Sequence, residues 1–435
     1  MGARHSHASS SSMTTMRPML AVIILAAMVT VAAMVFLWPS DQPEKLPTGE
    51  QRANATVTEV DRQTCPEPSS PEEIPPGADS GPNSCGTATF TLTSGKDKNK
   101  RVTSELPTGL GAPKVDVGDD VVVVETSGTD GQTYQIIDEQ RGRPLWILGA
   151  AFALAVIVFG RLRGLTALVG LVFTFGVLLL FIIPAILAGQ PPLPVAIVGS
   201  AAIMLFVLYL THGFSMSTSV AVAGTLVSLT LTGVLAAISA SATHLSGVAE
   251  ESAFYLGLMS GVDLQGLLLA GILIGSLGVL DDVTVTQAAT VTELAHANPA
   301  YGFRQLYQAA ARVGRAHIAS VINTIVLAYA GASLPLLLLI AANDQSLGKV
   351  LTDQLIAQEL VRSIVGTLGL IAAAPITTAL AALAASRHQP SKAKGRPPRR
   401  TPISRPSPRS ERPTAKTWEV GEALTERSPH PRDKW

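Results

Sequence analysis

The sequence predicts a mainly α-helical, polytopic membrane protein with a small all-β domain outside the membrane. Hydrophobic residues make up 47% of the chain and charged residues only 15%, whereas soluble domains carry about 25% charged residues. The apolar residues are concentrated between Leu145 and Ala385, where runs of about 20 apolar residues, long enough to cross a bilayer, follow one another.

The order of polar and apolar stretches predicts the domain organisation. We expect a cytoplasmic N-terminal segment, a transmembrane anchor, an extracytoplasmic β-domain, a membrane domain of about seven helices, and a disordered, basic, Pro-rich cytoplasmic tail. The respective bounds are 1–18, 19–38, 41–140, 145–385 and 386–435. The apolar anchor is longer than the ~7–15 residues of a secretory signal core, so we expect it to stay uncleaved.

The polar region before the membrane domain has the pattern of a small β-barrel or sandwich. Its runs TVTEV from Thr56, TATFTLT from Thr87 and VVVVET from Val121 are rich in β-branched residues and bounded by turn residues. The chain's two cysteines, Cys65 and Cys85, also lie here. A disulfide between them is expected in an oxidising compartment, the alternative being two unrelated thiols.

Basic clusters predict the orientation of the membrane domain. The predicted spans are 145–160, 165–188, 193–210, 214–240, 264–293, 318–341 and 364–385, which with the anchor makes about eight. The basic clusters are Arg161 and Arg163, then Arg304, Arg312 and Arg315, then Arg387, Lys392, Lys394 and Arg396. Because basic loops remain in the cytoplasm, this pattern predicts a multi-pass protein of the cell membrane with both termini cytoplasmic.

Asp281 and Asp282 interrupt the apolar pattern of the fifth of these spans. A charged carboxylate inside a bilayer costs roughly 3 kcal/mol or more. In one interpretation the span ends just before the aspartates, which cap a separate surface helix. In the other, one helix from about Leu267 to Ala295 holds them near the middle of the membrane. The absence of basic residues from 275–294 favours the long helix.

The long helix would carry a polar stripe. At ~100° per residue, Asp282, Thr286 and Glu293 fall within about 40° of one another, and we expect this stripe to face the bundle. Adjacent carboxylates in apolar surroundings can take up and release protons near neutral pH, as a proton relay or an ion site requires. The relay hypothesis therefore joins Asp281 to these three residues, with Asn323 of the next span as a partner.

Glycines precede the aspartates on the same helix. Gly271 and Gly275 form a GxxxG pattern, and Gly266 and Gly278 lie nearby. Because small residues let another helix approach closely, we expect these glycines to serve helix packing beside a polar cavity.

The stretch DLQGLLLAGILIGSLGVLDDVTVTQAATVTEL at 263–294 carries a family resemblance. It resembles the central signature of the YibE/F family of bacterial multi-pass membrane proteins, a Gly-rich span with an Asp and a downstream Glu. The resemblance covers most of 145–385, implies an anchor and an external domain before the spans, and leaves Asp281 as an additional residue. The positions that match the family's Asp, Glu and glycines are Asp282, Glu293, Gly271, Gly275 and Gly278.

The same region is similar, more loosely, to permeases of the resistance–nodulation–division and SecD/SecF type. Those permeases have an acidic pair in a Gly-rich span, then a Glu, a basic cytoplasmic loop and a span with Ser and Thr. The span count differs here and the external domain is smaller, so the similarity is an analogy.

These observations favour a transporter over an enzyme. An intramembrane aspartyl protease needs aspartates on different spans, whereas adjacent residues of one helix point about 100° apart. We predict no enzyme activity, no cofactor, no metal site and no nucleic-acid partner. The favoured function is an ion-coupled transporter or permease of unknown substrate that uses the aspartate pair. The alternative is a non-transporting assembly factor or sensor whose β-domain binds a partner.

The expected surroundings follow from the same composition. The spans require a lipid bilayer, and the basic tail is suited to contact with anionic lipid. A homo-oligomer or a partner membrane protein is left open by the sequence.

Overall fold

The computed structural model describes residues 13–39, 51–63, 85–108, 111–128, 131–248, 257–258, 261–342 and 347–387. Most of the predicted N-terminal segment and all but the first two residues of the predicted tail lie outside these ranges.

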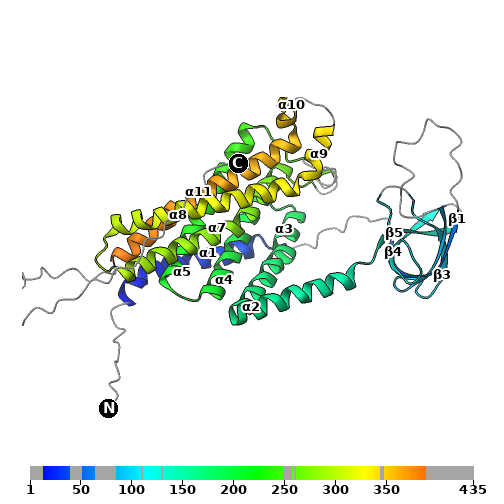
Figure 1. The fold of residues 1–435 in the computed structure, drawn as a ribbon, viewed down its shortest axis with the longest axis horizontal. Coiled ribbons are helices and arrows are strands. Elements are labelled where there is room, and N and C mark those ends of the chain that lie inside the picture. The colour runs from blue at the N-terminus through cyan, green and yellow to red at the C-terminus, as the bar shows by residue number, and fades with distance from the viewer. Residues whose placement is uncertain are drawn as a thin grey trace, which may run out of the picture. The chain divides into compact units, whose positions relative to one another are not determined.

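The polar region folds into one antiparallel sheet of five strands in the order β3-β2-β1-β4-β5 (Figure 1). The strands are β1 (Gln51–Gln63), β2 (Cys85–Leu92), β3 (Arg101–Glu105), β4 (Asp120–Gly128) and β5 (Gly131–Glu139). The first half of β1 pairs with β4 and the second half with β2, with a register shift between Val57 and Glu59. Because β3 also contacts β5, the sheet curls into a partly closed barrel.

Alternate strand residues fill the interior of this barrel, as a sheet with one buried face requires. The buried set is Ala53, Ala55, Val57, Ala88, Phe90, Leu92, Val121, Val123, Tyr134 and Ile136. The runs predicted as strands from Thr56, Thr87 and Val121 lie in β1, β2 and β4. Cys85, the first residue of β2, is disulfide-bonded. Its predicted partner Cys65 lies outside the described residues.

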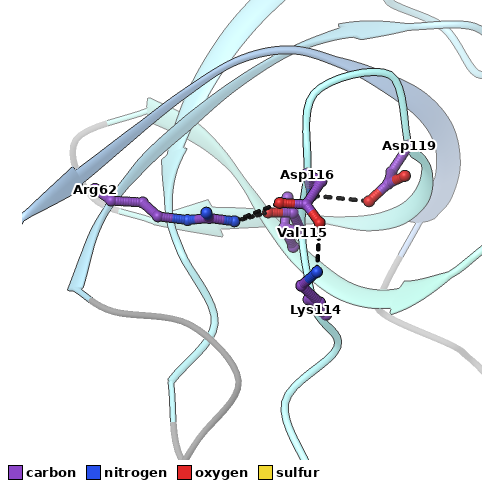
Figure 2. Close-up of polar contacts among 5 residues, drawn as sticks. All are labelled: Arg62, Lys114, Val115, Asp116 and Asp119. Carbon is purple, nitrogen blue, oxygen red and sulfur yellow. Dashed lines mark hydrogen bonds and ion pairs between the residues drawn. The ribbon is translucent and has the colours of Figure 1, made fainter.

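Charged side chains hold the segment between β3 and β4 against the end of β1 (Figure 2). The Arg62 guanidinium donates hydrogen bonds to the carbonyl oxygen of Val115 at 3.0 Å and to the Asp116 carboxylate. Lys114 Nζ lies 2.8 Å from the other carboxylate oxygen of Asp116. The Asp116 N–H donates to Asp119 Oδ2 at 2.8 Å, which closes the turn before β4.

This group of charges predicts a local acid sensitivity. Lys114 and Arg62 lower the pKa of Asp116 below its ordinary value of 3.8. A lowered folded-state pKa contributes stability that is present above the unfolded pKa and is lost as the pH falls. We therefore expect hydrogen exchange of residues 112–120, corrected for the intrinsic rate, to be constant above about pH 5 and to speed up as the pH falls below about 4. Asp116→Asn should remove that pH dependence, and an equal dependence in both proteins would contradict the assignment.

The other regular elements of the described chain are helices. They are α1 (Met13–Phe36), α2 (Gly142–Val177), the π-turn η1 (Leu178–Ile182), α3 (Ile183–Leu187), α4 (Pro192–His212), α5 (Met216–Ala242), α7 (Leu264–Ala297), α8 (Phe303–Ala332), α9 (Leu334–Ala342), α10 (Leu347–Thr352) and α11 (Gln354–Arg387). In the described residues, six helical stretches are long and apolar enough to cross a membrane, and α1 adds the shorter apolar stretch Leu20–Phe36. The chain is therefore suited to a lipid bilayer.

The longest stretch, Gly142–Leu187, is broken at Arg161. Its 46 residues would span about 69 Å as one straight helix, against about 30 Å for the hydrocarbon core. The backbone of Arg161 has φ 53° and ψ −129°, which lie outside the helical range. At Gly164 the carbonyl of Val156 comes so close that a Cβ would collide with it. The chain thus turns sharply where the sequence predicts a loop between two spans. The number of crossings, about eight, and the side on which the β-domain lies stay predictions.

The centre of the bundle is formed by α5, α7 and α11, with α4 and α8 packed on α7. Figure 1 shows α8 running alongside α11, with which it is in contact. Two glycines permit the close approach of α5 and α11. Gly224 faces Thr377, and Gly369 faces Thr232, so that a Cβ on either glycine would collide with the opposite hydroxyl. These close contacts bury the facing sides of α5 and α11.

Candidate functional site

The helix that carries the aspartates is continuous. It runs for 34 residues from Leu264 to Ala297, and the residue at its N-cap position is Asp263. Asp281 and Asp282 lie near its middle and begin no helix. The interpretation of these two residues as caps is therefore wrong, and the continuity of the long helix is confirmed. Their position near the middle of the membrane stays a prediction.

Both aspartates line a cavity of about 490 Å³ between α2, α4 and α7. The lining residues are Arg163, Ala167, Val207, Leu208, Thr211, His212, Asp281, Asp282 and Val285. The cavity thus combines a carboxylate pair with a guanidinium, an imidazole and a hydroxyl. It lies beside the last residues of α4 and just after the break in α2, so the aspartates are level with the C-terminal end of α4 and with that break.

The two aspartates differ in their surroundings. The side chain of Asp282 is 68% exposed, and its Oδ2 lies 4.0 Å from Nε2 of His317 on α8, an ion pair when that imidazole is protonated. Asp281 is half-buried. Sequence reasoning missed His317, because only the packing of α8 on α7 brings it to the aspartate. In the described residues, no three His, Cys, Asp or Glu side chains group closely enough to hold a metal ion.

The predicted polar stripe of α7 does not face the bundle. Asp282 and Glu293 are exposed and Thr286 is half-buried, whereas Thr284 and Gln287 lie on the buried face. The predicted orientation is wrong because contacts with α5 and α11, not the stripe, select the inner face. Glu293 also lies 11 residues beyond Asp282, about 16 Å along the helix, and does not line the cavity.

The predicted partner on α8, Asn323, lies away from the aspartates. Asn323 is exposed, while Ile318, Val321 and Ile325 on the other side of the helix pack against α7 and α11. In the described part of the chain, no carboxylate forms an ion pair with the arginines of α8, which are Arg304, Arg312 and Arg315. Of the residues predicted to form the relay, the described part of the structure therefore brings only Asp281 and Asp282 together in the cavity, and His317 approaches Asp282 from α8.

The sequence profile of the YibE/F-like proteins matches residues 148–387, which is more than half of the chain. The chain belongs to this family. The match begins in α2 and ends with α11, so this YibE/F-like region contains the whole aspartate cavity. No curated protein and no solved structure matches the chain.

The YibE/F-like region also contains a buried polar cluster that sequence reasoning missed. The hydroxyl oxygens of Thr225 on α5 and Thr284 on α7 lie 2.7 Å apart. Thr378 on α11 donates from Oγ1 to Gln287 Oε1 at 2.9 Å, and all four side chains are buried. Gly314 of α8 lies against the Gln287 amide, where a Cβ would be 2.7 Å from Nε2. The spacing of Thr284 and Gln287, three apart on a long apolar helix, is the signal that could have revealed this cluster.

The four glycines expected to pack helices behave differently from one another. A Cβ on Gly266 would meet Asp263 and Pro192, and a Cβ on Gly275 would lie 3.3 Å from the hydroxyl of Tyr329. A Cβ on Gly271 or Gly278 would meet nothing within 4 Å. Close packing is thus found at Gly266 and Gly275, and it is not found at the other two positions among the described residues.

Proposed function

We propose that this YibE/F-like protein is an ion-coupled transporter or permease that carries a proton or a cation with a solute. The supporting observation is the cavity in which Asp281 and Asp282 meet Arg163 and His212. Ionisable residues inside a membrane bundle are costly, and they mark ion and proton pathways. A carboxylate pair beside a guanidinium and an imidazole can bind and release a proton or a cation. The proposed transport involves no catalytic step.

Because Asp281 is the more buried of the two aspartates, we assign it the main ion-binding role. A half-buried carboxylate is only partly hydrated, so its binding of a proton or cation depends on the protein around it. Asp282 is largely exposed and faces His317, which suits it to passing the ion between the cavity and its surroundings. This order reverses the expectation from the sequence, in which Asp282 matches the Asp of the YibE/F signature.

The proposed topology has about eight crossings, with both termini and the arginine clusters in the cytoplasm. Arg163 lines the aspartate cavity, so the cavity would open towards the cytoplasmic side. We expect single cysteines placed between 51 and 63 to react with an impermeant thiol reagent in intact cells. Cysteines between 303 and 315 should react only after permeabilisation. External labelling near Arg304 would refute this topology.

The test of the transport proposal is a flux assay with the purified full-length chain in proteoliposomes. An imposed pH or cation gradient should drive ion flux that candidate solutes change, with empty liposomes as the background. Flux at the background level in both directions, for every ion gradient tested, would reject the proposal.

The alternative, an assembly factor or sensor that binds a partner through its β-domain, has one observation in its favour. A cavity of about 270 Å³ in this domain is lined by charged and aromatic side chains, Arg52, Lys96, Asp97, Glu125 and Tyr134 among them. The Tyr134 hydroxyl donates to Asp97 Oδ2 at 2.8 Å, and burial together with that carboxylate raises the pKa of Tyr134 to about 12. Under this alternative, substitution of Asp281 would leave the cellular phenotype intact while changes at this cavity abolish it.

A further inference from the structure

The outer side of α8 is almost uncovered. In the most apolar part of this helix only 6% of the residues are buried, whereas 44–56% are buried in the corresponding parts of α4, α5, α7 and α11. The residues of α8 that do pack, among them Ile318, Val321 and Ile325, lie on one face. In a bilayer the opposite face would be in contact with lipid or with another protein.

A polar side chain lies at the centre of this uncovered face. At ~100° per residue, Asn323 points almost directly away from Ile325 and Ile318. Its amide makes no hydrogen bond with any residue that the structure describes. The neighbouring Thr324 differs, because its hydroxyl donates to the carbonyl oxygen of Ser320 in its own helix at 3.2 Å. Lipid chains offer an amide no hydrogen bond, so they are a poor environment for Asn323.

Small residues surround this amide on the same face. They are Ala316, Ala319, Ser320, Ala330 and Gly331, all exposed. Small side chains let two membrane helices approach closely, and side-chain amides then hydrogen-bond between the helices. The face therefore has both the shape and the chemistry of a helix contact.

We infer that α8 pairs with α8 of a second copy of this chain through a symmetric contact centred on Asn323. An amide carries both a donor and an acceptor. At a two-fold axis, each Asn323 donates from Nδ2 to Oδ1 of the other, and both amides are satisfied by one arrangement. A different partner would need a matching polar residue at the same depth, whereas a second copy always supplies one.

The charges of α8 are compatible with this contact. Arg312 lies on the same face, 11 residues before Asn323 and thus about 16 Å along the helix. Helices that pack through small residues commonly cross at about −40°, so their ends diverge from the contact point. The two copies of Arg312 are then separated. His317, the residue of α8 that approaches Asp282, lies on another side of the helix from Asn323, so the pairing does not depend on the proposed transport function.

Site-specific crosslinking in native membranes tests the contact directly. Leu327, which is 62% exposed and lies one turn after Asn323, is replaced by a photoreactive amino acid in the full-length chain. We expect a product of twice the chain mass. The matched control is Val234, which is 53% exposed in α5 and should give no such product. Crosslinks from Leu327 to lipid alone, or to a protein of different mass, would overturn the inference.

The contribution of the amide is measured by the dissociation constant of the dimer in liposomes at varied protein-to-lipid ratios. Asn323→Ala should raise this constant about 3- to 30-fold, the range for one interhelical polar contact. Asn323→Gln, which keeps an amide, should recover part of the loss. Thr324→Ala removes a hydroxyl bonded within its own helix and should change the constant less than about 2-fold. An unchanged constant for Asn323→Ala, or an equal effect of Thr324→Ala, would contradict the pairing.

Discussion

Asp281→Asn should reduce the proposed ion flux to the level of empty liposomes while the protein folds and inserts normally. Asparagine fills the same space and adds no charge to the helix, so the bundle loses no packing contact. It cannot release or accept a proton as a carboxylate does, and it removes one negative charge from the cavity. The measurement is gradient-driven flux in proteoliposomes, with elution volume and far-ultraviolet circular dichroism as checks on folding.

Two further carboxylates provide the controls for this experiment. Asp282→Asn should reduce the flux less than Asp281→Asn, because the Asp282 side chain is 68% exposed and remains hydrated when charged. Glu293→Gln should leave the flux unchanged, because Glu293 is exposed and does not line the cavity. Full flux for a well-folded Asp281→Asn protein would remove the aspartate pair from the mechanism.

Gly369→Ala should destabilise the bundle by about 3 kcal/mol, the upper part of the range for overpacking. The added Cβ would overlap the Thr232 hydroxyl on α5, which is itself fully buried and bonded to the carbonyl oxygen of Ser228 at 2.8 Å. Because the overlap is with a buried side chain, the threonine or one of the two helices must shift to relieve it. The measurement is the midpoint of thermal unfolding or aggregation of the detergent-solubilised protein.

A matched glycine separates this effect from helix propensity. Gly271→Ala places a Cβ where no described atom lies within 4 Å, and alanine favours a helix over glycine by up to about 1 kcal/mol. We therefore expect Gly271→Ala to be neutral or slightly stabilising. Combining Gly369→Ala with Thr232→Ala should recover part of the lost stability, because the collision is then relieved. Equal destabilisation by Gly369→Ala and Gly271→Ala would show that packing between α5 and α11 is not the cause.

The sequence predicted those elements whose local pattern is strong. The long apolar runs, the three β-branched runs in β1, β2 and β4, and the continuity of α7 through Asp281 all followed from composition and from the absence of basic residues. The strands β3 and β5 were not predicted. Their sequences, RVTSE and GQTYQIIDE, have a smaller share of β-branched residues than the three predicted runs, and polar residues interrupt them. Pairing with β2 and β4 therefore contributes more to their strand structure than local preference does.

The direction in which side chains point was less predictable from the sequence than the helices and strands themselves. A helical wheel grouped Asp282 with Thr286 and Glu293 correctly but could not tell inside from outside, because α7 is apolar on nearly every side. The buried face was decided by the contacts of α7 with α5 and α11. Likewise, the approach of His317 to Asp282 depends on how α8 crosses α7, and no spacing within either helix encodes it.

The sharp turn at Arg161 has a consequence for biosynthesis. If both arms of Gly142–Leu187 cross the membrane, as in the proposed topology, their short connection would make them partition together as a helical hairpin whose charged tip stays on the side where synthesis occurs. A weakly apolar stretch in one arm would insert into the bilayer together with the more apolar arm. Each arm therefore tolerates more polar residues than a single isolated span would.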